Sequence, residues 1–127
     1  MTEAGSSAAH SRLVAECVEE LALRGYPAWP NQTGMAWRDD RPVRFGKKGS
    51  GDIIGCLPRL LNVEGSPLLV GVHLEVECKT GEAVQTKKQK AHMRAVLGCG
   101  GIYLVIRSRD ELRGWLDRNG YVGRPAA

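Results

Sequence analysis

Two carboxylates and one lysine are spaced so that a pair of β-strands would bring them together. Glu77 and Lys79 are two positions apart, and side chains at that spacing on a strand project from the same face. Asp52 lies 25 residues before Glu77 (77 − 52), which is enough for a strand, a turn and a returning strand. If those strands pair, the two carboxylates converge with the ammonium group of Lys79.

This combination of groups suits the hydrolysis of a phosphodiester bond. Carboxylate oxygens bind Mg²⁺ or Mn²⁺ at about 2.1 Å, and the metal polarises the phosphate and acidifies a bound water. A lysine beside the metal can orient the attacking water or stabilise charge in the transition state. The alternative for Glu75, Glu77 and Lys79 is a solvated strand face with weak ion pairs. The hypothesis of a site therefore depends on Asp52 joining them.

The sequence around these residues predicts the elements that would position them. Over 68–79 the even positions are all apolar and the odd positions from His73 to Lys79 are polar, which predicts a strand with one buried face. A shorter strand is predicted over 52–57, with a turn-rich link before Leu68. The other expected elements are a helix over about 7–24, an extended but interrupted segment over 26–37, a loop or irregular hairpin over 38–51, a helix over about 86–97, a central strand over 102–106 and a last helix capped by Ser108.

The whole chain, residues 1–127, is expected to form a single α/β domain. Its length suits one domain, and the order of the elements predicts a mixed sheet flanked by helices. The net charge of +4 favours anionic partners. No apolar run reaches the roughly 20 residues of a membrane-spanning helix, and the first residues lack the pattern of a signal peptide. We therefore expect a cytoplasmic protein without membrane association.

Two other kinds of site are not expected. The glycine-rich segment before Asp52 leads into a strand and lacks the Gly-Lys-Ser/Thr ending of a phosphate loop, so no nucleotide cofactor is expected. The four cysteines form no CxxC pair and stand among aliphatic residues, which favours buried thiols over a zinc site. These cysteines are Cys17, Cys56, Cys78 and Cys99.

The motifs resemble those of the VRR-NUC family, the virus-type replication–repair nucleases of the PD-(D/E)XK superfamily. The matching segments are Gly51-Asp52-Ile53-Ile54-Gly55, Glu77-Cys78-Lys79-Thr80-Gly81, Gln89 and Gly100-Gly101-Ile102-Tyr103-Leu104-Val105. The resemblance implies a restriction-endonuclease-like core of helix, three strands, helix and strand. It also implies a metal-dependent endonuclease, in a bacterial or phage-infected cell, that favours branched DNA such as Holliday junctions.

The resemblance gives each site residue a role. Asp52 and Glu77, with the backbone carbonyl of Cys78, would bind Mg²⁺ or Mn²⁺, Lys79 would orient the water, and Gln89 would support catalysis. The proline that usually precedes the first aspartate is replaced by Gly51, at a position that shapes a turn. Members often carry a glutamate on the inner face of the first helix. Here His10 could replace that acid, Glu16 or Glu20 could reach the metal from another angle, or all three could be solvated.

Two further features keep alternative interpretations. Gln89 either supports the site or only closes a capping box with Thr86 at the start of its helix. The basic residues on both sides of the site in sequence either contact DNA phosphates or form solvated faces. These residues are Arg44, Lys47, Lys48, Lys87 and Lys88.

The alternative function is a catalytically silent DNA-binding module that keeps the nuclease fold. A homodimer is the expected form, because a two-fold symmetric junction needs two matched incisions and a symmetric dimer supplies two sites. Dimerisation is also what the resemblance to stand-alone VRR-NUC proteins implies.

Overall fold

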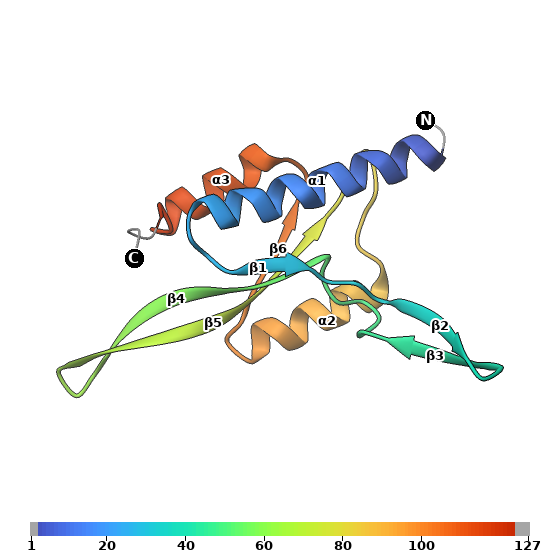
Figure 1. Cartoon of the computed structure of the whole chain (residues 1–127). Helices are drawn as coiled ribbons and strands as arrows, with labels where there is room; N and C mark the ends of the chain where they lie inside the picture. The colour runs from blue at the N-terminus through green and yellow to red at the C-terminus, as the bar shows by residue number, and fades with distance from the viewer. Residues whose placement is uncertain (1–2, 124–127) are drawn as a thin grey trace.

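The computed structural model describes residues 3–123. In chain order the elements are α1 (Glu3–Leu23), β1 (Ala28–Pro30), β2 (Gly34–Arg38), β3 (Arg41–Phe45), β4 (Ile53–Val63), β5 (Ser66–Cys78), α2 (Lys87–Gly98), β6 (Ile102–Ile106) and α3 (Arg109–Arg118). Four strands form a mixed sheet in the order β1-β4-β5-β6, in which only β5 and β6 are parallel. Helices α1 and α3 lie on one face of this sheet and α2 on the other (Figure 1). The predicted α/β fold with a mixed, helix-flanked sheet is confirmed.

The alternation along β5 separates the core from the opposite face, as the sequence predicted. Leu74, Val76 and Cys78 are buried and pack in one core with apolar side chains of α1 and α3. Glu75 and Glu77 project to the other face, where side chains of α2 and β6 contact them. Because the apolar face is packed on both helices, the acidic face of β5 has a fixed orientation.

Strand β6 lies at an edge of the sheet, whereas its apolar sequence predicted a central strand. It pairs with β5 alone. Its apolar character comes from cover on both faces: Leu104 and Ile106 belong to the core with α1 and α3, and Tyr103 points to the opposite face. Burial between helices thus produces the same sequence pattern as a central position in the sheet.

The predicted turn-rich link before Leu68 is wrong, because β4 and β5 continue through it as a paired ribbon. We call residues 58–71 the apolar arm; its strands are paired as far as Val63 and Ser66, and only Glu64 and Gly65 form the turn. Both turn residues have positive φ (50° and 84°), as two-residue hairpin turns require. The arm extends beyond β1 and β6, so it lies outside the body of the protein (Figure 1).

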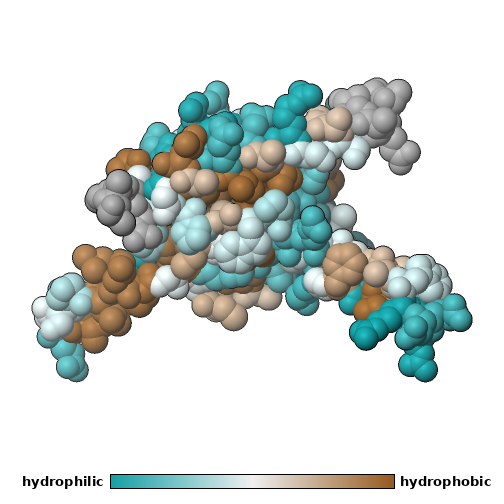
Figure 2. Space-filling model, viewed as in Figure 1, coloured by the Kyte–Doolittle hydropathy of each residue, from teal (hydrophilic) through white to brown (hydrophobic). Residues whose placement is uncertain are grey.

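The apolar arm carries many of the exposed large apolar side chains and appears brown at the lower left of Figure 2. They are Leu60, Leu61, Val63, Leu68 and Leu69. A two-stranded hairpin alone is marginally stable in water. Cover on this arm would therefore stabilise it.

A second hairpin, the β2–β3 arm, joins the end of the predicted extended segment to the start of the predicted loop. Its strands pair from Gly34 with Phe45 to Arg38 with Arg41, and Asp39 and Asp40 form the turn. It is a separate two-stranded sheet that projects from the body away from the apolar arm (Figure 1). The sequence predicted a loop or an irregular hairpin here, and the hairpin is regular.

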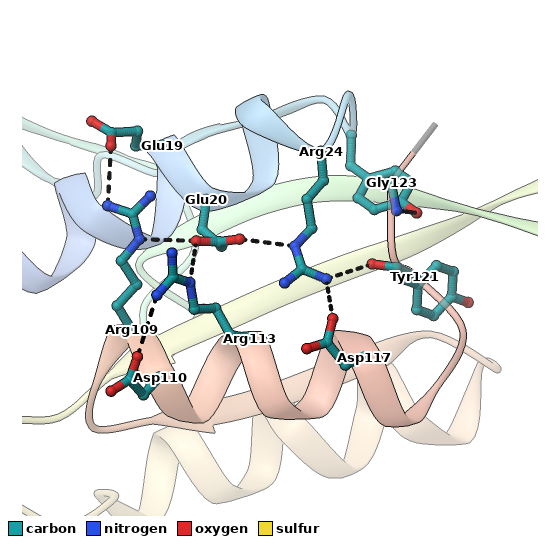
Figure 3. Close-up of polar contacts among 10 residues, drawn as sticks. Glu19, Glu20, Arg24, Arg109, Asp110, Arg113, Asp117, Tyr121 and Gly123 are labelled. Carbon is teal, nitrogen blue, oxygen red and sulfur yellow. Dashed lines mark hydrogen bonds and ion pairs between the residues drawn. The ribbon is translucent and has the colours of Figure 1, made fainter. Parts of the chain in front are cut away.

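A buried carboxylate joins α1 to α3. Glu20 accepts hydrogen bonds of 2.8, 2.9 and 2.9 Å from Arg24, Arg109 and Arg113 (Figure 3). Burial opposes the charged form of Glu20, but the three arginines outweigh burial and lower its pKa to about 2. Each side chain comes from a helix packed on the same face of the sheet, so this cluster fixes the two helices relative to each other.

The structure tests the predictions of buried cysteines and of no membrane-spanning helix. Cys17 and Cys78 are buried as predicted, but Cys56 is half-buried and Cys99 is exposed, so the prediction of buried thiols is wrong for Cys99. Cys99 directly follows α2 and caps its C-terminal end, outside the core. None of the described helices combines the length and the apolar character that crossing a membrane requires.

Candidate functional site

The C-terminal end of β5 meets the start of β4, and Asp52 and Glu77 lie together there. Ile53 is paired with Val76, so Asp52, one residue earlier, stands opposite Glu77. The Oδ2 atom of Asp52 accepts a hydrogen bond of 2.7 Å from the backbone N–H of Cys78. The two strands thus bring together the carboxylates that the sequence predicted.

Glu77 is buried, with an exposed fraction of 1%, and its two oxygens differ in their contacts. The hydroxyl of Tyr103 donates a hydrogen bond of 2.6 Å to Oε1. Oε2 is a buried oxygen with no hydrogen-bond partner among the described residues, and Lys79 Nζ lies 3.6 Å from it. Burial and then the contact with Glu77 raise the pKa of Tyr103, which keeps the phenol a donor at neutral pH.

Lys79 and Gln89 contact each other, and Gln89 also closes the capping box at the start of α2. The ammonium group of Lys79 donates a hydrogen bond of 2.9 Å to Gln89 Oε1. The same oxygen accepts a bond of 2.8 Å from the N–H of Thr86, and the N–H of Gln89 donates to Thr86 Oγ1 at 3.1 Å, which completes the capping box. The cap therefore fixes the side chain that holds Lys79.

The three residues of α1 that the sequence analysis proposed for the site, His10, Glu16 and Glu20, have different environments in the structure. His10 Nε2 lies 3.3 Å from Asp52 Oδ2, at the edge of the site. Glu16 is half-buried and makes no hydrogen bond or ion pair within the described part of the chain. Glu20 faces α3, where arginines occupy both of its oxygens, so it does not meet Asp52. Of these side chains, the structure brings only His10 to the carboxylates.

The sequence analysis did not identify the partners of Glu75, which is buried beside Glu77. Glu75 accepts hydrogen bonds from the N–H of Gly51 at 2.8 Å and from Nε2 of His73 and of His92 at 2.8 and 2.9 Å. Burial opposes its charge, but these three contacts outweigh burial and lower the pKa of Glu75. The cluster lines a pocket of about 580 Å³ between β5 and α2. His73 shares the face of Glu75 in the sequence pattern, whereas His92 comes from α2 and gave no such signal.

Asn31 positions the segment that carries Asp52, and no sequence pattern indicated this role. Its backbone N–H donates to the carbonyl oxygen of Asp52 at 2.7 Å. Its side-chain amide donates to Ser50 Oγ at 2.8 Å and to the carbonyl oxygen of Gly51 at 2.9 Å. These three bonds determine the direction in which the chain enters β4, and with it the position of the Asp52 carboxylate.

Three of the five predicted DNA-contacting residues form a cluster beside α2. The contact of Lys48 with Lys88, together with the charges of Lys88 and Arg44, lowers the pKa of Lys48. Lys47 lines a hollow with Lys48 and Lys88, whereas Lys87 is exposed and no such contact involves it among the described residues. Like charges held together favour an anionic ligand, because an anion relieves their repulsion.

The donor set of the site fits a cation that prefers oxygen. No group of three His, Cys, Asp or Glu side chains converges as a metal site in residues 3–123. The set predicted from the sequence has two carboxylates, Asp52 and Glu77, completed by the backbone carbonyl of Cys78. Such oxygens suit Mg²⁺ or Mn²⁺, and a cation would satisfy the partnerless Oε2 of Glu77.

Comparisons of the chain with protein-family models, with curated proteins and with solved structures found no match.

Proposed function

We propose that this chain is a metal-dependent nuclease that hydrolyses phosphodiester bonds in DNA. In this proposal its fold is a restriction-endonuclease-like core, and its site is of the VRR-NUC type within the PD-(D/E)XK superfamily. The observation that carries the proposal concerns Oε2 of Glu77, which is buried and has no hydrogen-bond partner among the described residues. Asp52 stands opposite Glu77 across the two strands, and the Lys79 ammonium group lies 3.6 Å from this oxygen. A protein keeps a buried charge incompletely paired at a cost to stability, and a bound cation would remove that cost.

Asp52 and Glu77, with the backbone carbonyl of Cys78, would hold Mg²⁺ or Mn²⁺. The metal would supply Lewis-acid polarisation of the phosphate and acidification of water. Tyr103 donates to Glu77 Oε1 and thereby leaves Oε2 as the free ligand atom. The N–H of Cys78 holds one oxygen of Asp52 in a similar way. Each carboxylate thus has one oxygen fixed by the protein, which orients the other.

Lys79 is the residue that would act on the water or the phosphate. Gln89 accepts a hydrogen bond from its ammonium group, and Glu77 lies within ion-pair distance of it. Its side chain is 12% exposed, so few solvent molecules compete with these contacts. An ammonium group held in this way can orient a nucleophile or stabilise the charge that develops on the phosphate.

The proposed substrate is DNA, with branched molecules favoured, and the basic cluster is its phosphate-binding surface. Arg44, Lys48 and Lys88 lie close together next to α2, and Lys88 directly precedes Gln89 in that helix. Phosphate contacts of this kind give affinity that falls steeply with salt.

A cleavage assay tests the proposal. Labelled four-way junctions, flaps and linear duplexes are incubated with the protein in Mn²⁺, in Mg²⁺ and in EDTA, and cleavage and gel shift are scored separately. We expect metal-dependent cleavage by the wild type and none by Lys79→Met, while Glu82→Gln, a charge change at an exposed turn, retains activity. Binding without cleavage in both metals would instead support the catalytically silent DNA-binding module.

We propose a homodimer as the active form, with the apolar arm as the contact between copies. The arm exposes leucine and valine side chains and carries few charges, and within residues 3–123 no strand pairs with it beyond the ends of β1 and β6. A second copy offers the same apolar ribbon, so a symmetric contact covers both. Light scattering is expected to give twice the mass of 13.8 kDa, and Leu60→Asp with Leu69→Asp is expected to give the monomer. A monomeric wild type that cuts junctions normally would overturn the dimer.

A further inference from the structure

The β2–β3 arm presents a large aromatic side chain to water on a face that also carries an arginine. Every residue of β2 and β3 is exposed, and the exposed fraction of Trp37 is 73%. Paired positions of an antiparallel ribbon share a face, so Met35, Trp37, Pro42 and Arg44 lie on one side of the arm. Figure 2 shows the arm at the lower right, mostly hydrophilic with a smaller apolar area. An exposed indole beside a guanidinium suits a ligand that is both aromatic and anionic.

Contacts at the root of the arm fix it relative to Asp52. The ring of Phe45 lies over Gly34, where an added Cβ would come within 2.9 Å of the ring. Asn31, three residues before the arm, is bonded to the carbonyl oxygens of Gly51 and Asp52. The arm and the proposed metal ligand are therefore held by the same short segment of chain.

Positive charge connects the Trp37 face with the proposed cleavage site. Arg44, on that face, lines a hollow with Lys48 at the root of the arm, and Lys48 lines a second hollow with Lys88. Lys88 lies in the first turn of α2, next to Gln89, which accepts a hydrogen bond from the proposed catalytic lysine. Gly49 lies against the same turn of α2, where an added Cβ would come within 2.8 Å of the Lys88 carbonyl oxygen. The basic residues thus form a continuous route from the arm to the site.

We propose that the β2–β3 arm binds a single-stranded segment of DNA beside the bond to be cut, with Trp37 stacked on an unpaired base and Arg44 on a phosphate. The inference rests on the proposed nuclease function and names its substrate class: DNA with unpaired nucleotides next to a duplex. Every base has a face that can stack on an aromatic ring, so the arm selects DNA structure and not sequence. In an intact duplex each base is already stacked on its neighbours, and Trp37 has no face to bind.

The acidic turn of the arm limits where the DNA backbone can run. Asp39 and Asp40 have φ of 48° and 63°, the left-handed conformation that a two-residue hairpin turn needs and that aspartate tolerates. Their carboxylates repel phosphates. The backbone therefore follows the Arg44 and Lys48 side of the arm, while the base reaches Trp37.

The test measures DNA binding by fluorescence anisotropy in EDTA, where no cleavage occurs. The two probes are a perfect duplex and the same duplex with a short single-stranded gap. Trp37→Ala is expected to lower affinity for the gapped DNA about tenfold or more, and to leave the perfect duplex unchanged. Trp37→Phe retains most of the affinity, because its ring still stacks. Val43→Ala is the matched control, since Val43 is exposed on the opposite face of the same arm.

Equal losses on both probes, or no loss on the gapped DNA, would overturn the arm proposal. Circular dichroism of each variant checks the fold. Cleavage of the gapped DNA by the wild type in Mn²⁺ is measured separately, so the two proposals can fail independently. If the gap-specific loss is found but no DNA is cut, the nuclease function fails and the DNA site on the arm stands. If the wild type cuts while Trp37→Ala binds the gap normally, the arm proposal fails alone.

Discussion

Glu20 and Glu77 are both buried glutamates, and the protein surrounds them in opposite ways. Three arginines donate hydrogen bonds to the two oxygens of Glu20 (Figure 3). Glu77 is more deeply buried, yet one of its oxygens has no hydrogen-bond partner among the described residues, and its nearest cation, Lys79, is 3.6 Å away. Glu20 therefore has three cationic partners for one negative charge, whereas Glu77 has a single cation nearby and an oxygen without a hydrogen bond.

This difference separates a carboxylate that stabilises the fold from one available to a ligand. A buried charge with a full set of partners holds its neighbours in place, and removing it leaves those partners unpaired. A buried charge with an unused oxygen costs stability in the free protein, and removing it relieves that cost. Substitutions at the two glutamates are therefore expected to affect different properties of the protein.

The largest expected effect is on cleavage. Glu77→Gln keeps the shape of the side chain and a hydrogen-bond acceptor for Tyr103, but removes a proposed metal ligand. Because metal stabilisation of the transition state amounts to several kcal/mol, we expect cleavage to fall by about a thousandfold or more. The thermal midpoint of unfolding should stay the same or rise. If Glu77→Gln cut DNA at the wild-type rate, or were strongly destabilised, the distinction between Glu77 as a ligand-binding carboxylate and Glu20 as a fold-stabilising carboxylate would be wrong.

The next effect is on stability at the other glutamate. Glu20→Gln removes the buried charge to which half-buried Arg24 and Arg109 and exposed Arg113 donate, and we expect a loss of about 3–5 kcal/mol in the free energy of unfolding. Cleavage per folded molecule should be unchanged. Urea denaturation measures the loss. Glu19→Gln is the matched control, because Glu19 is exposed and its one ion pair among the described residues is with Arg109, so its loss should stay below about 1 kcal/mol.

Acid should remove the contribution of Glu20 over a defined pH range. Its pKa is lowered from the ordinary value of 4.5 to about 2 in the folded protein, so the folded state favours the charged form. The stabilisation is fully present above pH 4.5, falls as the pH drops toward 2, and amounts to about 3 kcal/mol. Unfolding free energies of wild type and Glu20→Gln, measured in urea between pH 7 and pH 2, should converge at the acid end. Parallel curves over this range would contradict the assignment.

The smallest effect on cleavage is expected at Glu75. It lies on the same face of β5 as Glu77, but its carboxylate is fully hydrogen-bonded within the protein. Gly51, His73 and His92 satisfy its carboxylate. We expect Glu75→Gln to lower cleavage by less than about tenfold, through a shift of the segment that carries Asp52 rather than through loss of a ligand. Single-turnover rates in Mn²⁺ compare Glu75→Gln with Glu77→Gln. Equal losses would break the assignment of the metal ligand.

The sequence predicted the carboxylates better than their surroundings, for a physical reason. Glu77 and Lys79 share a strand, and Asp52 is its hairpin partner, so spacing and alternation were enough to place them. Two of the three arginine partners of Glu20 are 89 and 93 residues away on α3, and no local pattern indicates a contact between two helices. The distal half of β4 and the first two residues of β5 were missed because Pro58, Asn62 and Pro67 are residues typical of turns.

The turn at Glu64 and Gly65 lies at the far end of the apolar arm, yet it determines how the two carboxylates meet. The ribbon is paired without interruption from Val63 and Ser66 to Ile53 and Val76. Hairpins form in about 1–10 μs, so this ribbon can align Asp52 with Glu77 before the helices dock. A shift of one residue in that alignment would turn Glu77 toward the core. The length of the exposed turn at Glu64 and Gly65 is therefore constrained by the need to align Asp52 with Glu77 at the opposite end of the hairpin. Insertions in this turn should be tolerated less well than insertions in other exposed turns.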